Sequence, residues 1–157
     1  MKLFKQKEVI LQEIKIKLQH KGVKVPTYAT DGSGCFDIYA ELAPACISCT
    51  VTAGQPTEIE TGLYFEIPEG KSLLVFSRSG HGFRNGVRLA NAVGIIDSDY
   101  RGMLKVKLTA DGDGMLVVNH GDRIAQGMII DTPKVTFKVV DNISETKRGF
   151  GGFGSTG

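Results

Sequence analysis

Short segments in which apolar and polar residues alternate are the dominant pattern along this chain. They occur at residues 14–18, 104–108 and 135–139, and each contains lysine at a polar position. Successive side chains of a β-strand point to opposite faces of its sheet, so each segment is predicted to be a strand with one apolar face. Two further segments, 73–76 and 128–130, are continuously apolar and are predicted to be strands buried on both faces.

Turn-forming sequences separate these segments along the whole chain. They are Asp31-Gly32, Pro68-Glu69-Gly70, Asn85-Gly86, Asp111-Gly112 and His120-Gly121-Asp122. Many short strands separated by such turns are typical of an all-β sandwich or barrel. Only residues 1–13 and 79–86 are compatible with a helix, and the glycines of the second segment predict that any helix there is short.

Composition and charge narrow the functional classes. A length of 157 residues suits one domain, and a net charge of +2 is too small for the basic field of a nucleic-acid-binding protein, so we expect no stable nucleic-acid binding. No apolar segment approaches the roughly 20 residues that span a bilayer, and Lys5, Lys7 and Glu8 interrupt any signal-peptide core. We therefore expect no membrane association and a cytoplasmic (intracellular) location.

The cysteines and histidines do not form a recognisable metal site. Cys46 and Cys49 form one CxxC pair, but a structural zinc site needs a second pair of ligands and a thioredoxin-like site needs a βαβ context. We expect these thiols and Cys35 to be reduced and inactive. The three histidines, His20, His81 and His120, show no ligand spacing and are predicted to be surface or loop residues.

The last ten residues, 148–157, are half glycine and suggest an anion-binding segment. Gly149, Gly151 and Gly154 satisfy the G-x-G-x-x-G dinucleotide pattern, but no helix can follow them in the three residues that remain. Glycines do allow successive backbone N–H groups to converge on phosphate oxygens, and Ser155 and Thr156 add hydroxyl donors. Arg148 supplies a planar cation and Phe153 a ring that could stack on a base. The alternative is a disordered tail.

Residues 94–102 hold two carboxylates, Asp97 and Asp99, close together. One carboxylate could orient a water molecule for attack on phosphorus, and Tyr100 could pack against a deoxyribose. The alternative interpretation is a hairpin whose Asp-Ser-Asp tip is solvated.

Three other short segments have polar groups in informative places. Residues 77–80 combine Arg78 with two serines before a glycine, which suits phosphate binding or a polar loop. Residues 121–126 contain Asp122 and Arg123, which could simply pair on the surface. Asp37 lies inside an apolar run, where a buried acid needs hydrogen bonds or a nearby metal.

In this order and spacing, the five segments resemble the motifs of the trimeric dUTPase family (deoxyuridine triphosphate nucleotidohydrolases). Residues 94–102 and 151–157 are the most specific matches. The resemblance implies a jelly-roll-like β-barrel or sandwich, a homotrimer with active sites at the subunit interfaces, and a nucleotide substrate. It also implies Mg²⁺-dependent hydrolysis of dUTP to dUMP and pyrophosphate. That reaction limits uracil incorporation into DNA and supplies dUMP for thymidylate synthesis.

The resemblance implies roles for residues around the nucleoside. Asp97 would orient the water that attacks the α-phosphate, and Gln126 would help to hold it. Tyr100 would lie beneath the deoxyribose. The pocket for uracil would be lined by Asn91, by the backbone of residues 92–96, which includes Gly94, Ile95 and Ile96, and by the backbone near Lys105.

The resemblance also implies roles around the phosphates. Arg78, Ser79 and Gly80 would bind them, and Asp37 would position metal-bound water without ligating Mg²⁺ directly. Arg148 would reach the γ-phosphate and Phe153 would cover the uracil, as part of a flexible arm that includes Gly154, Ser155 and Thr156. Three residues depart from the family pattern: Cys35 replaces a glycine, Ser77 a proline, and Phe150 a small or acidic residue.

These expectations divide the chain into an N-terminal extension (residues 1–12), a β domain (13–147) and the arm (148–157). Two alternative functions stay open at this point. A dCTP deaminase would resemble the same fold, although residues 84–96 lack the acidic side chain that deamination requires. A catalytically inactive relative would act as a nucleotide-sensing regulator.

Overall fold

The structure is a computed structural model that describes residues 12–155; residues 1–11 of the predicted extension, Thr156 and Gly157 lie outside the described part. In the described part the chain is almost entirely β, which confirms the predicted fold class. Its elements are β1 (Lys15–Leu18), β2 (Thr27–Tyr28), β3 (Phe36–Tyr39), β4 (Ser48–Thr52), β5 (Thr57–Glu66), β6 (Lys71–Phe76), α1 (Ser79–Asn85), β7 (Val87–Leu89), β8 (Val93–Ile96), β9 (Met103–Ala110), β10 (Met115–Asn119) and β11 (Arg123–Asp131).

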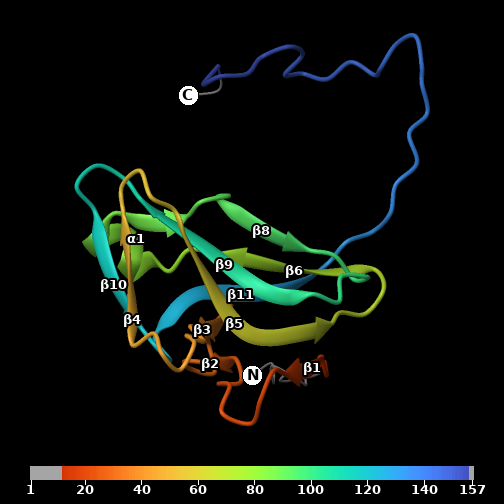
Figure 1. The fold of residues 1–157 in the computed structure, drawn as a ribbon. Helices are drawn as coiled ribbons and strands as arrows, with labels where there is room; N and C mark the ends of the chain where they lie inside the picture. Colours follow the sequence, from red (N-terminus) through yellow and green to blue (C-terminus); the bar gives the residue numbers. More distant parts are fainter. Residues whose placement is uncertain (1–11, 156–157) are drawn as a thin grey trace, which may run out of the picture.

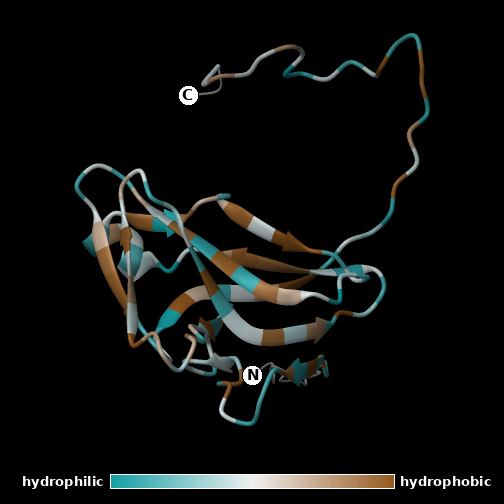
Figure 2. Cartoon of the chain, viewed as in Figure 1, coloured by the Kyte–Doolittle hydropathy of each residue, from teal (hydrophilic) through white to brown (hydrophobic). Residues whose placement is uncertain are grey.

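The strands form two larger antiparallel sheets and a two-stranded ribbon (Figure 1). One sheet has the order β1-β5-β9-β7, the second has the order β2-β3-β11-β6-β8, and β10 pairs with β4 in the ribbon. Buried apolar residues of the two larger sheets join in one core, and the colouring of Figure 2 shows apolar and polar positions alternating along β9. Central members of the core are Ile38, Ile59, Leu63, Leu73, Leu108 and Ile124.

Four of the five predicted strand segments are strands, since residues 14–18, 73–76, 104–108 and 128–130 coincide with β1, β6, β9 and β11. The prediction that 73–76 and 128–130 are buried on both faces is wrong, because Leu74, Phe76 and residues 128–130 are only half-buried. In β9, the buried residues Leu104, Val106 and Leu108 alternate with exposed lysines, as the sequence pattern indicates. Residues 135–139 have the same pattern but form no strand, so this prediction is wrong for the chain on its own. Val135, Phe137 and Val139 are exposed, and within residues 12–155 no strand pairs with them. Alternation creates an apolar face, but a strand also needs a hydrogen-bonding partner.

Helix α1 is short, as its glycines predict. It has seven residues and is capped at its C-terminal end by Gly86, whose φ of 61° is left-handed and whose N–H bonds to the carbonyl oxygens of His81 and Gly82. A Cβ at this position would also lie 3.2 Å from the Asp111 oxygen. Glycine is therefore required where α1 turns into β7.

The chain leaves the body of the protein after β11. Residues 132–155 contain no helix or strand, and Figure 1 shows them running away from the sheets to the C-terminal end. We call residues 132–155 the tail. Its root lies at Asp131, next to β6 in the second sheet.

Candidate active site

The buried carboxylate of Asp37 is the centre of a first group of predicted site residues. Asp37 lies on β3 and is only 2% exposed. Strand β11 runs between β3 and β6, and its Gln126 is directly opposite both Asp37 and Phe76. This register gathers Arg78, Arg123 and Gln126 around one carboxylate, and we call these four residues the Asp37 cluster.

Two guanidinium groups and one amide surround the Asp37 carboxylate. Arg123 Nη1 donates a hydrogen bond to Oδ2 at 3.2 Å, and Gln126 Nε2 donates to Oδ1 at 3.3 Å. Arg78 Nε lies 3.4 Å from Oδ1, which is an ion-pair distance without the geometry of a hydrogen bond. A buried carboxylate without such partners would destabilise the fold, so the cluster compensates for the burial of Asp37.

The guanidinium group of Arg78 keeps hydrogen-bonding capacity for a ligand. Its Nε is buried against Asp37 and Nη1 faces Arg123 O, but Nη2 makes no hydrogen bond within residues 12–155. Arginine presents five N–H donors in a planar fork that fits phosphate oxygens. Arg78 is therefore placed both to neutralise Asp37 and to bind an anion.

The residues on either side of Arg78 are fixed by neighbouring elements. Ser77 Oγ accepts a hydrogen bond of 2.8 Å from Leu89 N, so the serine that replaces the usual proline ties this segment to β7. Ser79 and Gly80 follow as the first residues of α1. Ser77, Arg78 and Ser79 line a shallow hollow of about 270 Å³. A proline side chain has no oxygen, so this hydrogen bond is possible only because Ser77 replaces the proline.

A second group of predicted residues lies where β8 leads into β9. Together they line a hollow of about 230 Å³ formed by Ile95, Ile96, Asp97, Tyr100, Met103, Leu104 and Lys105, which we call the β8–β9 hollow. The two strands belong to different sheets and do not pair, so the Asp-Ser-Asp segment is a turn between sheets and not a hairpin tip. Asp97 is exposed, and its carboxylate has no hydrogen bond or ion pair within the described residues. It is therefore free to orient a water molecule.

Local contacts hold Tyr100 at the rim of this hollow. Its backbone N–H donates to the Asp97 oxygen at 3.2 Å, and its hydroxyl donates to the Met103 oxygen at 3.1 Å. The ring lies over Gly102, where any Cβ would collide with it. Gly102 is therefore needed for the ring to lie across the turn.

The entry to β8 contains a strained turn. Ala92 has φ of 61°, a left-handed conformation that costs a residue with a side chain about 1–2 kcal/mol. Val93 N donates to Asn91 O at 2.7 Å in this turn. Two residues further on, Gly94 is buried opposite Val75, and a Cβ there would lie 3.2 Å from Val75 Cβ. Close packing and strain thus fix the backbone predicted to contact uracil.

The ammonium group of Lys105 is engaged away from any ligand. It lies 2.9 Å from Glu58 and 3.5 Å from Glu60, both on the adjacent strand β5. The hydrogen bond with Glu58 raises the pKa of Lys105 and lowers the pKa of Glu58. The backbone of Lys105 remains the part predicted to border the pocket.

The two groups of predicted residues do not meet within one chain. Ile96 is opposite Leu73 of β6, whereas Gln126 is opposite Phe76 on the other side of the same strand. These positions are about 10 Å apart along β6 and about 10 Å apart across it. Asp97 follows Ile96 and is further away still. One water molecule cannot contact both Asp97 and Gln126 of the same chain.

The predicted residues of the tail are not close to either group. Arg148 Nε donates to the Gly151 oxygen at 2.7 Å, and Phe153 is fully exposed with φ of 51°. Gly154 and Ser155 follow in a turn in which Ser155 N donates to Gly152 O at 3.0 Å. Phe150 is also fully exposed. Within residues 12–155, no hydrogen bond or ion pair joins the tail residues from 148 onward to the Asp37 cluster or to the β8–β9 hollow.

Two residues of the site were missed by sequence reasoning. Arg123 was interpreted as the surface partner of Asp122, but it pairs with Asp37, while Asp122 Oδ2 accepts a hydrogen bond of 2.8 Å from Asn119 N. His81, predicted to be a surface or loop residue, is half-buried and lies 2.7 Å from the carbonyl oxygen of Arg123. The only signal in the sequence was Asp37 itself, an acid in an apolar run that was predicted to need hydrogen bonds or a nearby metal.

The cysteines carry no sign of a metal or redox centre. All three are free, and burial together with the neighbouring Cys46 raises the pKa of the Cys49 thiol, which disfavours its reactive thiolate. Within residues 12–155, no group of three or more His, Cys, Asp or Glu side chains is arranged to hold a metal ion. The same part of the chain contains no helix of the length and apolarity that a membrane span requires.

Comparison with known proteins identifies relatives along almost the whole chain. The dUTPase family model matches residues 21–157. A deoxyuridine 5'-triphosphate nucleotidohydrolase of Desulfitobacterium hafniense is 42% identical over 152 residues, which cover 94% of this chain and 99% of the relative. The enzyme of the same name from Hahella chejuensis is 38% identical and covers 96% and 98%.

Solved structures agree with this fold. The dUTPase of Staphylococcus bacteriophage 80alpha with dUpNHpp has a TM-score of 0.81 at 24% identity and covers 94% of this chain and 99% of its own. A mutant dUTPase from phage phi11 of S. aureus, solved to show the coordination of a structural Mg(II) ion, has a TM-score of 0.70 at 20% identity and covers 83% and 98%. At these identities the likeness establishes the fold.

Proposed function

This chain belongs to the dUTPase family and hydrolyses dUTP to dUMP and pyrophosphate; from this premise we propose that two chains of a homotrimer build each of its active sites. The activity supplies dUMP, and the relatives' hydrolase activity favours hydrolysis over deamination and over a purely regulatory role. In the proposed site, the β8–β9 hollow of one chain binds the nucleoside. The Asp37 cluster of a neighbouring chain binds the phosphates. A cytoplasmic location would place the enzyme with its nucleotide substrate.

The separation of the two groups is the observation that carries this proposal. Asp97 and Gln126 are assigned to the same water molecule, yet β6 holds them apart in one chain. A second chain can bring its own Gln126 to the Asp97 of the first without any change of fold. In a closed ring of identical subunits, the same pair of surfaces recurs at every interface. Three chains would therefore give three equivalent sites.

The β8–β9 hollow suits a deoxyuridine. Backbone N–H and C=O groups of residues 92–96 can donate to the uracil oxygens and accept from its ring N–H, and the strained turn at Ala92 fixes their direction. Tyr100 at the rim would lie against the sugar, where an added 2′-hydroxyl would clash. Asp97 at the exit of β8 would orient the water that attacks the α-phosphate, as a general base requires.

The Asp37 cluster suits the triphosphate and its metal ion. Arg78 would contact phosphate oxygens with its free donors, beside Ser79 and Gly80. Each Asp37 oxygen already has a nitrogen partner, which fits a role in holding metal-bound water better than direct ligation. Mg²⁺, which keeps several waters and binds mainly through phosphates, would neutralise charge on the phosphate oxygens. The phi11 enzyme, similar in fold, holds a structural Mg(II) ion.

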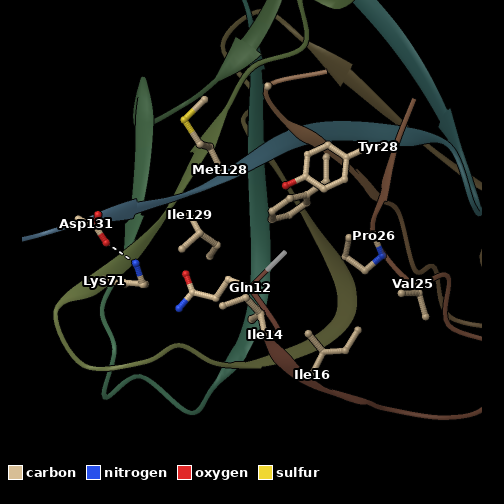
Figure 3. A pocket seen from close by; sticks show the side chains of 12 residues that line it. Gln12, Ile14, Ile16, Val25, Pro26, Tyr28, Lys71, Met128, Ile129 and Asp131 are labelled. Carbon is tan, nitrogen blue, oxygen red and sulfur yellow. Dashed lines mark hydrogen bonds and ion pairs between the residues drawn. The ribbon is translucent and has the colours of Figure 1, made fainter. Parts of the chain in front are cut away.

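Unsatisfied apolar surface supports association of several chains. A groove of about 490 Å³ is lined by both polar and apolar residues, the apolar ones including Ile14, Ile16, Pro26, Phe36 and Ile129, and an ion pair between Lys71 and Asp131 lies at one end (Figure 3). Strand β1 beside it is the edge of its sheet. The exposed, strand-like residues 135–139 have no partner within the described part of their own chain. Together these surfaces favour contact between chains.

The tail would complete the site as a covering arm. Arg148 and Phe153 would close over the γ-phosphate and the uracil, with Gly154, Ser155 and the undescribed Thr156 adding donors. Deletion of residues 148–157 should then lower turnover about a hundredfold, because closure aligns the water and excludes solvent. Size-exclusion chromatography should still find a trimer. Normal dUTP turnover by the truncated enzyme would contradict the role of the arm.

Complementation between two inactive variants tests the two-chain site directly. Asp97→Asn damages the hollow and Arg78→Gln damages the cluster, so each variant alone should be inactive. Trimers refolded from an equal mixture should recover about one quarter of wild-type activity, because one interface in four then joins two intact halves.

The matched control combines two variants of the same half. Asp97→Asn mixed with Tyr100→Ala should give no more than the mean activity of the two variants alone, because every interface keeps a damaged hollow. Failure of Asp97→Asn and Arg78→Gln to complement in trimers of confirmed mixed composition would contradict a site shared between chains. Recovery in the control mixture would contradict it as well.

A further inference from the structure

His81 is turned from the helix towards the Asp37 cluster. It lies in the first turn of α1, where its neighbour Phe83 is 93% exposed, but its own ring is half-buried against the start of β11. Nε2 of His81 lies 2.7 Å from the carbonyl oxygen of Arg123. A carbonyl can only accept, so Nε2 carries the hydrogen and donates it. This bond links α1 to the strand that supplies Arg123 and Gln126.

The same carbonyl oxygen also contacts Arg78. Arg78 Nη1 lies 3.4 Å from Arg123 O and 3.4 Å from His81 Nε2. Because both nitrogens carry hydrogens, the contact between them is packing and not a hydrogen bond. His81 and Arg78 therefore lie side by side as donors to one acceptor, and the imidazole limits where the guanidinium can move.

Few other contacts orient Arg78. Its distances to Asp37 and to Arg123 O are both 3.4 Å, and its buried Nε has no hydrogen-bond partner within residues 12–155. The hollow in front of it, about 240 Å³, is lined by Arg78, His81, Asp122, Arg123, Ile124 and the apolar residues 116–118 of β10. Among these residues, only His81 packs against the guanidinium while being held in place by a short hydrogen bond, the one to Arg123 O.

We propose that His81 is a positioning residue for the triphosphate, which holds Arg78 in the direction from which it binds phosphate. The inference rests on the proposed phosphate-binding role of Arg78. His81 acts through its hydrogen bond to Arg123 O, which fixes the ring against the guanidinium. Its loss should weaken binding of the phosphates and leave the attack by water nearly unchanged.

Substitutions that keep or remove the donor test this role. His81→Leu should raise both the KM for dUTP and the inhibition constant of inorganic pyrophosphate about tenfold, the effect of one lost hydrogen bond. The kcat should change less than about threefold, because the missing contact is made equally in ground and transition states. His81→Gln places an amide N–H near the position of Nε2 and should remain within about threefold of wild type in KM. Arg84→Gln, an exposed cation of the same helix, is the matched control.

A double-mutant cycle separates His81 from Arg78. If His81 acts through Arg78, His81→Leu should change the calorimetric dissociation constant of a non-hydrolysable dUTP analogue by less than about twofold in an Arg78→Gln background. Additive losses in the double variant would overturn the proposal. A wild-type KM for His81→Leu would also overturn it, and so would equal losses in the Leu and Gln variants. Wild-type behaviour of Arg78→Gln would instead refute the phosphate-binding role of Arg78 itself.

Thermal unfolding and size-exclusion chromatography check that each variant is folded and assembled. If His81→Leu does not fold, His81→Asn replaces it, because its amide is one carbon too short to reach Arg123 O. The proposal then requires a raised KM for the Asn variant and a KM near wild type for the Gln variant. Equal values for the two would overturn it.

Discussion

The Asp37 cluster and the β8–β9 hollow are built by different means. In the cluster, side chains of β11 and Arg78 at the start of α1 fix a buried carboxylate of β3 by ion pairs and hydrogen bonds. The hollow is exposed, and its shape comes from the backbone: a left-handed residue at Ala92, a tyrosine laid over Gly102 and a close-packed Gly94. The cluster therefore contributes to stability as well as to the site, whereas the hollow depends on a strained backbone for its shape.

This difference fits what each region is proposed to recognise. Phosphates carry charge, and preorganised cations bind them best when the protein already holds those cations in place. Uracil is neutral and planar, and a fixed pattern of peptide groups can read its edge. Mutation of Asp37 should consequently act chiefly on stability, and mutation of Asp97 chiefly on turnover.

The largest effect is expected from Asp97→Asn in the hollow. Loss of the general base should lower kcat by about 10²- to 10⁴-fold. Because the side chain is exposed and has no partner within the described residues, the melting temperature should stay unchanged. Pyrophosphate release measures the first quantity and calorimetric binding of a non-hydrolysable dUTP analogue measures retained affinity. Unchanged turnover would remove Asp97 from the mechanism.

Asp37→Asn in the cluster should show the opposite balance. The new amide places a donor against two guanidinium groups, and we expect a loss of about 1–3 kcal/mol in the free energy of unfolding. The partial exposure of Arg78 and Arg123 keeps the cost below that of a fully buried pair. Urea denaturation at a fixed protein concentration measures it. A variant as stable as wild type would show that the cluster does not stabilise the fold.

A smaller effect, of opposite sign, is expected from Ala92→Gly. Glycine adopts the left-handed φ of this position without strain, so relief of strain should stabilise the protein by about 1 kcal/mol. The greater backbone entropy of glycine in the unfolded chain offsets part of this gain. The loosened turn should raise the KM for dUTP. Thermal unfolding and steady-state kinetics measure the two effects. A destabilised variant with unchanged KM would mean that the turn holds no useful strain.

The smallest effect is expected from the exposed ion pairs. Like the Asp37 cluster they join acidic and basic side chains, but their carboxylates are exposed to solvent. Hydrogen bonds from Lys105, Lys15 and Arg88 lower the pKa of Glu58, Glu66 and Asp111 respectively. Their contribution to stability is present above the ordinary carboxyl pKa and is lost as the pH falls through the lowered values.

Glu58→Gln tests this surface contribution. It should make the melting temperature slightly less dependent on pH in that acidic range, and added salt should reduce the difference from wild type. Differential scanning fluorimetry across acidic pH values measures the change. A fall in stability as large as that of Asp37→Asn would contradict the expectation that exposed ion pairs stabilise the fold less than the Asp37 cluster does.

Hydrophobic patterns predicted β1, β6, β9 and β11 because alternation or a continuous apolar run indicates which faces of a strand are buried. The other strands of the described part were not predicted. The alternation at 104–108 matches the burial of β9 residue by residue. The same reasoning was wrong for 135–139, because whether an apolar face is covered depends on a partner that sequence spacing does not specify. Strand prediction thus succeeded where another strand of the described chain pairs with the segment.

The candidate site was predictable residue by residue but not as an arrangement. An acid within the apolar run at Asp37 indicated a buried group that needs partners, and Arg78 and Gln126 were both singled out. Arg123 and His81 were missed because their roles arise from the register of β3, β11 and α1, which join residues more than 40 positions apart. Nor does spacing along the chain reveal that β6 separates Asp97 from Gln126.

As the proposed covering arm, the tail would act as a tether with a fixed root. Asp131 anchors it in the second sheet, and the 17 peptide steps from there to Arg148 can span at most about 60 Å. Within that reach, the local concentration of the covering residues depends on contour length more than on sequence. A few glycines inserted near residue 143 should hardly alter closure, because its entropic cost grows only with the logarithm of length. Shortening the tether below its span would abolish closure altogether.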